Sequence, residues 1–315
     1  MSGPGIDIKA FRVVAALAEE LNFKRAAIKL GIGQSAVSKT LQTVERLLGH
    51  PLFFRNGRRV RILPAGERFV DEGRISLVHH GRAIELAKRA NEHTDLPIYV
   101  GKSPYTDPYL LSHLFSLRLP RFPRLKITLT SKLTPHLSHD LLNGILDLAF
   151  LTGMPETAQL SSTVVATQQF FVAMLKDSKL AKRKQVERDD LAGHSCILFE
   201  RHVNPHLYDA LVNETKPASL PGTQLHHFMT AEEASQYVLT GLGAAVLSQN
   251  SAWRIARNGI TMRPLNIETV VETRLACRTD ADARVVGAFQ RGFVKRLQAS
   301  KPGPQSKLRL NGTVA

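Results

Sequence analysis

The sequence predicts a two-part fold: a small helical N-terminal domain with a basic β-hairpin and a long connecting helix, then a larger α/β domain. Three observations favour this fold class. Short amphipathic helical patterns fill the first fifty residues, a hairpin signal follows at Asn56-Gly57, and strand-like and helix-like segments alternate from residue 98 onward. The length of 315 residues suits two domains with buried cores.

The charge balance indicates an anionic partner. The formal net charge is +15 at pH 7, and residues 1–90 contain 16 Lys and Arg residues against 8 Asp and Glu residues. Positive charge is therefore concentrated in the N-terminal third, as expected of a nucleic-acid-binding domain, although a basic balance alone can serve solubility.

Two observations concern the compartment. The sequence has no run of 18 apolar residues, and its first ten residues lack the apolar stretch of a signal peptide, so we expect a cytoplasmic protein with no membrane partner. Cys196 and Cys277 have apolar neighbours and belong to no motif, so we expect both to be reduced core residues.

The sequence lacks the common catalytic and metal-binding motifs. No HExxH, GxSxG, P-loop or Rossmann fingerprint occurs. His202 and His206 have the spacing of two ligands on one helical turn, but Pro205 between them would disrupt a helix beyond its first turn. We therefore expect no catalytic residue, no metal and no cofactor, and an enzyme is the least favoured class.

Three helical patterns occupy residues 6–48. The first spans 6–20, the second spans 23–30 with Asn22 as N-cap and Gly31 as C-cap, and the third runs from an N-cap at Gly33 to about residue 48. A tight glycine turn between the second and third helices predicts a helix-turn-helix. The residues expected on the buried face of the third helix are Ala36, Val37, Leu41, Val44, Leu47 and Leu48.

The opposite face of the third helix is polar and carries Gln34, Ser35, Ser38, Lys39 and Gln42. Such a helix can enter the major groove of DNA, where Gln and Ser bind base edges and Lys binds guanine or phosphate. The alternative is a solvated face on an ordinary three-helix domain.

A basic hairpin follows. Two strand-like runs flank Asn56-Gly57, and Arg55, Arg58, Arg59 and Arg61 cluster on them. Beside a helix-turn-helix, such a hairpin is expected to be a wing that contacts phosphates or the minor groove. We predict that Arg55, Arg58 and Arg59 contact DNA.

Pro64 is expected to begin a long helix that extends to about residue 90. Small and apolar residues recur on it at spacings of four and three, which favours pairing of two such helices in a dimer. Packing on the helix's own domain is the alternative. The residues of this seam are Gly66, Val70, Gly73, Leu77, His80, Ile84 and Ala87.

Strand and helix patterns alternate beyond a polar hinge at 91–97. Strands are expected at 98–101, 126–130, 146–151, 170–175, 196–199, 244–247 and 274–277, and helices at 109–119, 135–143, 231–240 and 281–297. This alternation predicts parallel sheets with crossover helices. The Pro- and Gly-rich tail is expected to be disordered.

The N-terminal pattern closely resembles the LysR-type transcriptional regulators, and the phrases FPRLKITL, LLNGILDLAF and GLGAAVL resemble their C-terminal domain. The matching N-terminal residues are Phe11, Ala15, Phe23, Ala26, Ala27, Leu30, Gln34, Ala36, Val37, Ser38, Leu41, Glu45, Gly49, Leu52, Phe53, Arg55, Ala65 and Gly66. The chain departs from the family pattern at Gly33, Ser35, Lys39, Leu63 and Ser248, which bears on base preference rather than on the fold.

The resemblance implies a complete architecture. It comprises an N-terminal all-α winged helix-turn-helix (1–63), a long linker helix for dimerisation (64–90), the hinge (91–97), a C-terminal α/β two-lobed periplasmic-binding-protein-like domain (98–297) and the tail (298–315). Lobe I would comprise 98–165 and 268–297, and lobe II would comprise 166–267, with a ligand cleft between them.

Ligands of open α/β sheets bind at the carboxyl ends of strands, so the loops after the first two strands supply candidate residues. These are Lys102, Ser103, Tyr105, Ser131 and Thr134; by the resemblance, Ser103 and Thr134 match positions that bind effector carboxylates. On lobe II the resemblance implies Arg201, Asn204, Pro205 and Leu207. Hydroxyls and helix N-termini suit an aromatic or other small carboxylate.

The sequence as a whole predicts a LysR-type DNA-binding transcriptional regulator whose operator binding or promoter activation responds to a small-molecule effector. The expected partners are a double-stranded DNA operator, further copies of the chain in a homodimer or homotetramer, RNA polymerase and a small organic acid. The alternative is an architectural DNA-binding protein whose C-terminal domain only oligomerises.

Overall fold

A computed structural model describes residues 5–56, 59–90, 97–117, 125–153, 157–219, 221–281 and 284–300. The chain divides into two compact units, Met1–Thr94 and Asp95–Ala315. Three expected features lie outside the described residues: the Arg58 contact, all of the hinge except Pro97, and the tail beyond residue 300. No helix among the described residues is long and apolar enough to cross a membrane.

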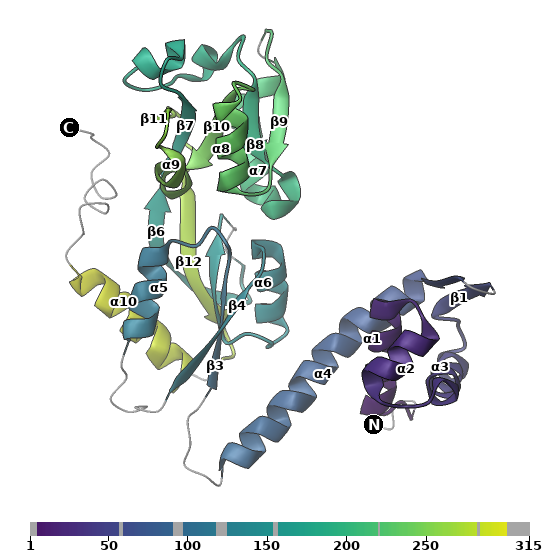
Figure 1. The fold of residues 1–315 in the computed structure, drawn as a ribbon. Helices are drawn as coiled ribbons and strands as arrows, with labels where there is room; N and C mark the ends of the chain where they lie inside the picture. The colour runs from purple at the N-terminus through teal and green to yellow at the C-terminus, as the bar shows by residue number, and fades with distance from the viewer. Residues whose placement is uncertain are drawn as a thin grey trace. The chain divides into compact units, whose positions relative to one another are not determined.

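The first unit is a three-helix domain with a hairpin and a long helix (Figure 1). Its elements are α1 (Ile8–Glu20), α2 (Phe23–Leu30), α3 (Gln34–Leu48), β1 (Phe53–Asn56), β2 (Arg59–Ile62) and α4 (Pro64–Ala90). The predicted caps are confirmed, because the Asn22 side chain accepts a hydrogen bond from Arg25 N at 3.0 Å and Gly31 is left-handed with φ +66°. The helix-turn-helix and its hairpin are therefore present where the sequence predicts them.

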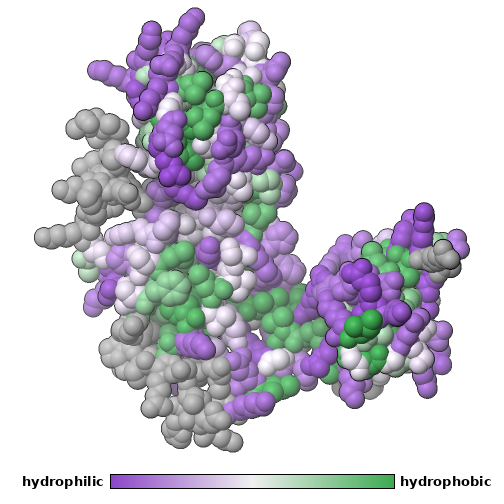
Figure 2. Space-filling model, in the orientation of Figure 1, coloured by the Kyte–Doolittle hydropathy of each residue, from purple (hydrophilic) through white to green (hydrophobic). Residues whose placement is uncertain are grey.

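The hairpin has the predicted position. Phe53 pairs with Ile62 and Asn56 pairs with Arg59, so Asn56 ends β1 instead of occupying the turn. Hydrophilic residues cover most of the visible surface of this unit (Figure 2).

The buried face of α3 is narrower than predicted. Val37, Leu41 and Val44 are buried, whereas Ala36 and Leu47 are exposed. Both exposed residues line an open groove between α3 and the start of α1, which no other side chain of the described unit fills. The hydrophobic periodicity predicts the helix correctly. Whether other side chains cover Ala36 and Leu47 depends on how the domain packs in three dimensions.

Half of the seam on α4 packs on its own domain. Gly66, Val70 and Gly73 are buried, and Phe69 stacks on Phe11 of α1 with ring centroids 4.9 Å apart. Further along the same helix, Ile84 is 44% exposed. The seam therefore serves the domain core at its start and is exposed toward its end.

The second unit contains two five-stranded sheets, one in each lobe (Figure 1). Lobe I contains β3 (Pro97–Lys102), α5 (Pro108–Ser116), β4 (Lys126–Ser131), α6 (Thr134–Leu142), β5 (Leu148–Thr152), β6 (Leu160–Gln168), β12 (Val271–Arg278) and α10 (Val286–Ala299). Lobe II contains β7 (Phe170–Leu175), β8 (Cys196–Phe199), α7 (Pro205–Thr215), β9 (Leu225–Phe228), α8 (Ala231–Leu239), β10 (Ala244–Ser248), α9 (Gln249–Ile255) and β11 (Ile260–Pro264).

The expectation of purely parallel sheets is wrong. The strand orders are β4-β3-β5-β12-β6 and β11-β7-β10-β8-β9. In each sheet four strands share one direction and one strand opposes them: β12 runs antiparallel to β5 and β6, and β7 runs antiparallel to β10 and β11. The reason is connectivity: the chain crosses between lobes twice, and the crossing strands enter each sheet from the other lobe's side.

Several elements have no counterpart in the sequence prediction. The strands β6, β9 and β11 and the helices α7 and α9 fall in segments to which the sequence analysis assigned no element. In β6 (LSSTVVATQ) buried and exposed residues do not alternate regularly, so the strand lacks the period-two signal. It forms because it pairs along its whole length with β12.

A close backbone approach at Gly66 gives the first prediction. A Cβ atom at Gly66 would lie 2.3 Å from Leu52 O and 2.8 Å from Ile62 Cγ1, whereas a Cβ atom at Gly81 on the same helix would meet nothing within 4 Å. We expect Gly66→Ala to lower the free energy of unfolding of the first unit by about 2 kcal/mol. Gly81→Ala should raise it by up to about 1 kcal/mol through helix propensity.

Calorimetric unfolding of the full chain, following the transition of the N-terminal unit, measures both effects. Equal stability of the two variants would show that the approach between α4 and residue 52 is not tight.

Candidate functional site

The polar face of α3 is available to a partner. Gln34, Ser35, Lys39 and Gln42 are exposed and Ser38 is half-buried. Within the described part of the chain, none of these five side chains takes part in a hydrogen bond or ion pair. Gly33 at the N-cap offers no side-chain acceptor, so the first-turn N–H groups of α3 also remain open to an anion.

The hairpin is held against α3 by Glu45, which the sequence analysis did not single out as functional. Its carboxylate accepts hydrogen bonds from Leu52 N at 2.8 Å and Phe53 N at 3.2 Å, and from Arg55 Nη2 at 2.9 Å. The Arg55 guanidinium also lies over the Phe23 ring, 5.0 Å from its centroid. Arg55 therefore has a structural task although it stays partly exposed, and Arg59 is the other described arginine of the predicted DNA contacts.

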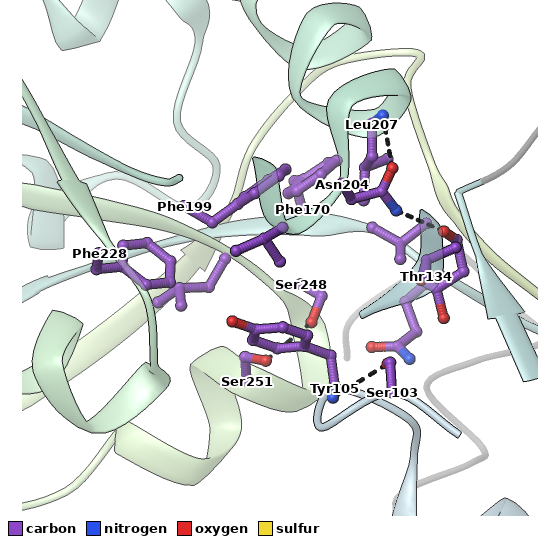
Figure 3. Close-up of a pocket in the computed structure, with 15 residues that line it drawn as sticks. Ser103, Tyr105, Thr134, Phe170, Phe199, Asn204, Leu207, Phe228, Ser248 and Ser251 are labelled. Atoms are coloured by element: carbon purple, nitrogen blue, oxygen red, sulfur yellow. Dashed lines mark hydrogen bonds between the residues drawn. The ribbon is translucent and has the colours of Figure 1, made fainter. Parts of the chain in front are cut away.

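A cavity of about 60 Å³ lies between the two lobes of the second unit (Figure 3). It forms where the parallel strands of both sheets end, because residues at or just after the ends of β3, β4, β5, β8, β9 and β10 line it. Its lining residues are Ser103, Tyr105, Thr134, Thr152, Gln168, Phe170, Phe199, Val203, Asn204, Leu207, Phe228, Leu247, Ser248, Ser251 and Val271.

The lining is neutral and has two chemically different sides. Lobe I contributes the hydroxyl groups of Ser103 and Thr134, whereas lobe II contributes the rings of Phe170, Phe199 and Phe228 on the other side of the cavity (Figure 3). No Lys, Arg, His, Asp or Glu is among the lining residues that the structure describes. The cavity can therefore bind a molecule with one polar end and one apolar end, without supplying a side-chain ion pair.

Two hydrogen bonds join the lobes across this cavity. The Tyr105 hydroxyl of lobe I donates to the backbone oxygen of Met229 in lobe II, and Asn204 Nδ2 of lobe II donates to Thr152 O at 2.5 Å. Burial, together with the nearby Glu232 and Glu233 carboxylates, raises the pKa of Tyr105 and keeps its hydroxyl protonated as a donor. The structure thus shows the lobes in contact around the cavity.

Of the nine residues that sequence analysis proposed for the cleft, five line the cavity: Ser103, Tyr105, Thr134, Asn204 and Leu207. Lys102 ends β3 and its neighbour Ser103 takes the cavity side, as the alternation of strand side chains requires. Ser131 is exposed at the end of β4, and Pro205 is the first residue of α7.

Arg201, which was predicted to contact the effector, forms an ion pair instead. Its guanidinium makes a two-pronged ion pair with Asp209, at 2.8 and 2.7 Å, and its side chain is 62% exposed. The two cations expected in the cleft, Lys102 and Arg201, are therefore not brought to it.

Four of the ten missed lining residues obey the rule that found Ser103. Thr152, Phe199, Phe228 and Leu247 lie at the carboxyl ends of other strands. Applying the rule to every predicted strand would have found Thr152, Phe199 and Leu247, but not Phe228, because its strand β9 was not predicted. Gln168 also ends a strand but was missed because β6 was not predicted, and Val271 carries no such signal because it begins β12.

The cysteines are free and buried, as predicted. Burial raises the pKa of the Cys196 thiol to about 11 and also raises the pKa of the Cys277 thiol. Among the described residues, no group of three His, Cys, Asp or Glu side chains is arranged to hold a metal ion.

Comparison with known proteins identifies both units. Residues 8–67 match the family model described as "Bacterial regulatory helix-turn-helix protein, lysR family", and residues 93–297 match that described as "LysR substrate binding domain". The uncharacterized transcriptional regulator YnfL of Escherichia coli K12 is 27% identical over 271 residues, which are 84% of this chain and 90% of that protein.

The name of a second relative refers to hydrogen peroxide. The hydrogen peroxide-inducible genes activator of Escherichia coli O6:H1 is 29% identical over 195 residues, which are 62% of this chain and 64% of that protein. The match thus spans less than two thirds of that relative's length.

The fold is shared with solved regulators. The crystal structure of CbnR, a LysR family transcriptional regulator, matches with a TM-score of 0.72 at 19% identity and covers 92% of this chain and 99% of that one. CbnR complexed with its target DNA matches with the same TM-score at 18% identity.

The Glu45 clamp gives a second prediction. Glu45→Ala leaves the N–H groups of Leu52 and Phe53 without their acceptor and removes the Arg55 ion pair, so we expect a loss of about 1–3 kcal/mol in the stability of the N-terminal unit. Thermal unfolding and fluorescence anisotropy on labelled DNA measure stability and DNA affinity.

The matched control is Glu67→Ala, which removes the same charge from an exposed position on α4. Loss of a negative charge alone strengthens DNA binding slightly, so Glu67→Ala should bind a little more tightly and Glu45→Ala more weakly. Tighter binding by both variants would mean that the clamp does not orient the wing.

Proposed function

The chain belongs to the LysR family of bacterial regulators, and we propose that it is a transcriptional regulator whose DNA binding is controlled by a small molecule held between its two C-terminal lobes. One observation carries this proposal: a chain with an uncommitted polar helix face in a helix-turn-helix also contains a cavity between two lobes. The combination supports a sensor joined to a DNA reader.

On DNA, the N-terminus of α3 enters the major groove. Ser35, Ser38 and Lys39 contact bases, Gln34 and Gln42 share base and phosphate contacts, and Arg59, with Arg58 beside it, contacts the backbone or minor groove. Paired copies, a dimer or a dimer of dimers joined through α4, read half-sites about one helical turn apart. The operator lies in the cytoplasm, and RNA polymerase is the downstream partner.

In the cleft, effector binding selects one relative arrangement of the lobes over another. A cavity of about 60 Å³ admits only a few water molecules, whereas a dry cavity of ~150 Å³ is known to hold benzene. A ring-sized effector therefore requires the lobes to move apart, which changes the Tyr105–Met229 and Asn204–Thr152 contacts. By linkage, operator DNA changes effector affinity by the same factor.

The signal is a bound molecule and not oxidation of a thiol, although a relative is named for induction by hydrogen peroxide. A redox-sensing cysteine needs an exposed thiol with a lowered pKa. Both thiols here are buried on strands of different lobes, and burial raises the pKa of each.

DNase footprinting of the full chain on the DNA that flanks its own gene tests the function. We expect an extended protected site that shortens or shifts with one member of a panel of small organic acids and their neutral analogues. Ser103→Ala should protect the same site and respond poorly to that compound. A site that no compound changes would favour the architectural alternative, and no sequence-selective protection would contradict the regulator.

Lys39→Ala gives a third prediction. If Lys39 reads guanine, the variant loses about 1–3 kcal/mol on the operator and much less on random DNA. Binding isotherms on both DNAs measure the difference, with Lys126→Ala on the edge of lobe I as the charge-matched control. An equal loss on both DNAs would assign Lys39 to phosphate.

The thiols give a fourth prediction. With a pKa of about 11, Cys196 is about 0.1% thiolate at pH 8, so a disulfide reagent should modify the folded chain slowly and both cysteines quickly after unfolding. Above the ordinary thiol pKa of 9, the unfolded chain loses this proton first, so the free energy of unfolding falls as pH rises from 9 to 11. Rapid modification of the folded chain by the reagent or by peroxide would favour a thiol sensor.

A further inference from the structure

Gln168 occupies a position that the family motifs did not point to. It is the last residue of β6, pairs with Val271 at the start of β12, and so lies where both crossing strands pass between the lobes. It lines the cavity, yet its side chain belongs to a residue only 4% exposed. A buried amide at this point is expected to have partners for both of its polar atoms.

Only one of those atoms has a partner within the described part of the chain. Gln168 Oε1 accepts a hydrogen bond from Asn250 N at 3.1 Å, at the start of α9 in lobe II. A backbone N–H requires an acceptor, so this bond fixes the orientation of the amide and makes Nε2 the other atom. Among the described residues nothing accepts a hydrogen bond from Nε2, and the cavity that Gln168 lines is where an acceptor can reach it.

Thr134 repeats the pattern on lobe I. It is 3% exposed, lines the same cavity, and its hydroxyl has no hydrogen-bond partner among the described residues. Thr134 also begins α6, whose N-terminal dipole favours a partial or full negative charge nearby. Two donors that have no partner in the described chain thus open onto the same cavity, where one acceptor from outside can meet them.

The rest of the cavity constrains the other end of the ligand. Phe170, Phe199 and Phe228 line its lobe II side, where an aromatic ring finds offset or edge contacts (Figure 3). Among the described lining residues no cationic side chain is present to balance a second negative charge, and a buried unpaired charge is costly.

We propose that Gln168 is a specificity-determining residue that donates, together with Thr134, to the single hydrogen-bond-accepting group of an aromatic effector whose ring packs on the three phenylalanines. This deepens and rests on the proposed function, since the ligand is the effector of the cleft. The same amide holds the first turn of α9, so an effector that engages Nε2 acts directly on the junction between the lobes.

The test swaps hydrogen-bond donor and acceptor, first on the ligand and then on residue 168. Calorimetric titration of the full chain uses benzoate with its hydroxy and chloro derivatives, which present an acceptor, and benzylamine with the corresponding derivatives, which presents a donor. The unmodified chain should bind at least one acceptor-bearing ring, and its amine counterpart at least about tenfold more weakly. In Gln168→Glu the acceptor for Asn250 N remains and the donor is replaced by an acceptor, so this preference should reverse.

Two further variants serve as controls. Gln236→Glu adds the same charge at an exposed position on α8 and should leave both affinities within about twofold. Gln168→Met keeps the side-chain length without either polar atom, and should weaken the acceptor-bearing ligand at least about tenfold without improving the amine. If Gln168 served only to hold Asn250 N, Gln168→Met would weaken all ligands together and Gln168→Glu would keep the preference of the unmodified chain.

The proposal is overturned if Gln168→Glu keeps the preference of the unmodified chain, or if no acceptor-bearing aromatic compound binds at millimolar concentration. Footprints recorded on the same samples separate this from the proposed function. If the operator is protected but no aromatic compound binds, only the effector class is rejected. If the ligand preference reverses in Gln168→Glu but no operator is protected, only the regulator is rejected.

Discussion

The double crossing of the chain between the lobes is the constraint on which the second unit depends. The strands β6 and β12 pair along their lengths and lie side by side, with β6 running toward lobe II and β12 running back into lobe I (Figure 1). One crossing strand enters each sheet against its parallel strands: β7 enters lobe II and β12 enters lobe I, so the carboxyl ends of the parallel strands of both sheets face the same cleft. A cavity lined from both sheets follows from this connectivity, and so does a hinge at which a small rotation alters every contact across the cavity.

Two polar contacts between the lobes border the cavity, beside the packing of Tyr105 and Leu133 on the lobe II core. Tyr105 and Asn204 each donate to a backbone oxygen of the opposite lobe, and such bonds contribute only about 1 kcal/mol each in net terms. A ligand of modest affinity can therefore compensate for their loss, which suits a protein that must respond to changing concentrations. A neutral cavity wall adds selectivity, since it offers hydrogen bonds and aromatic contacts but no ion pair among its described residues.

In the N-terminal unit, one carboxylate links the recognition helix to the wing. Glu45 lies on α3, accepts two backbone N–H groups at the start of the hairpin and pairs with Arg55, which in turn covers Phe23 of α2. This network fixes the wing relative to the helix whose polar face is free. The rigid placement of two DNA-contacting elements reduces the entropy lost on binding.

Local chemistry determined much of this protein from its sequence. Asn22, Gly31 and Pro64 mark helix boundaries by capping and by fixed backbone angles, and the buried strand 170–175 is recognisable from its composition alone. The rule for strand ends locates Ser103 and Thr134 from the order of strands and loops along the chain. Tertiary structure alone decided the rest, because it depends on which distant segments pair: the antiparallel β12, the exposure of Ala36 and Leu47, the withdrawal of Arg55 into an ion pair, and the placement of Gln168 at the crossing.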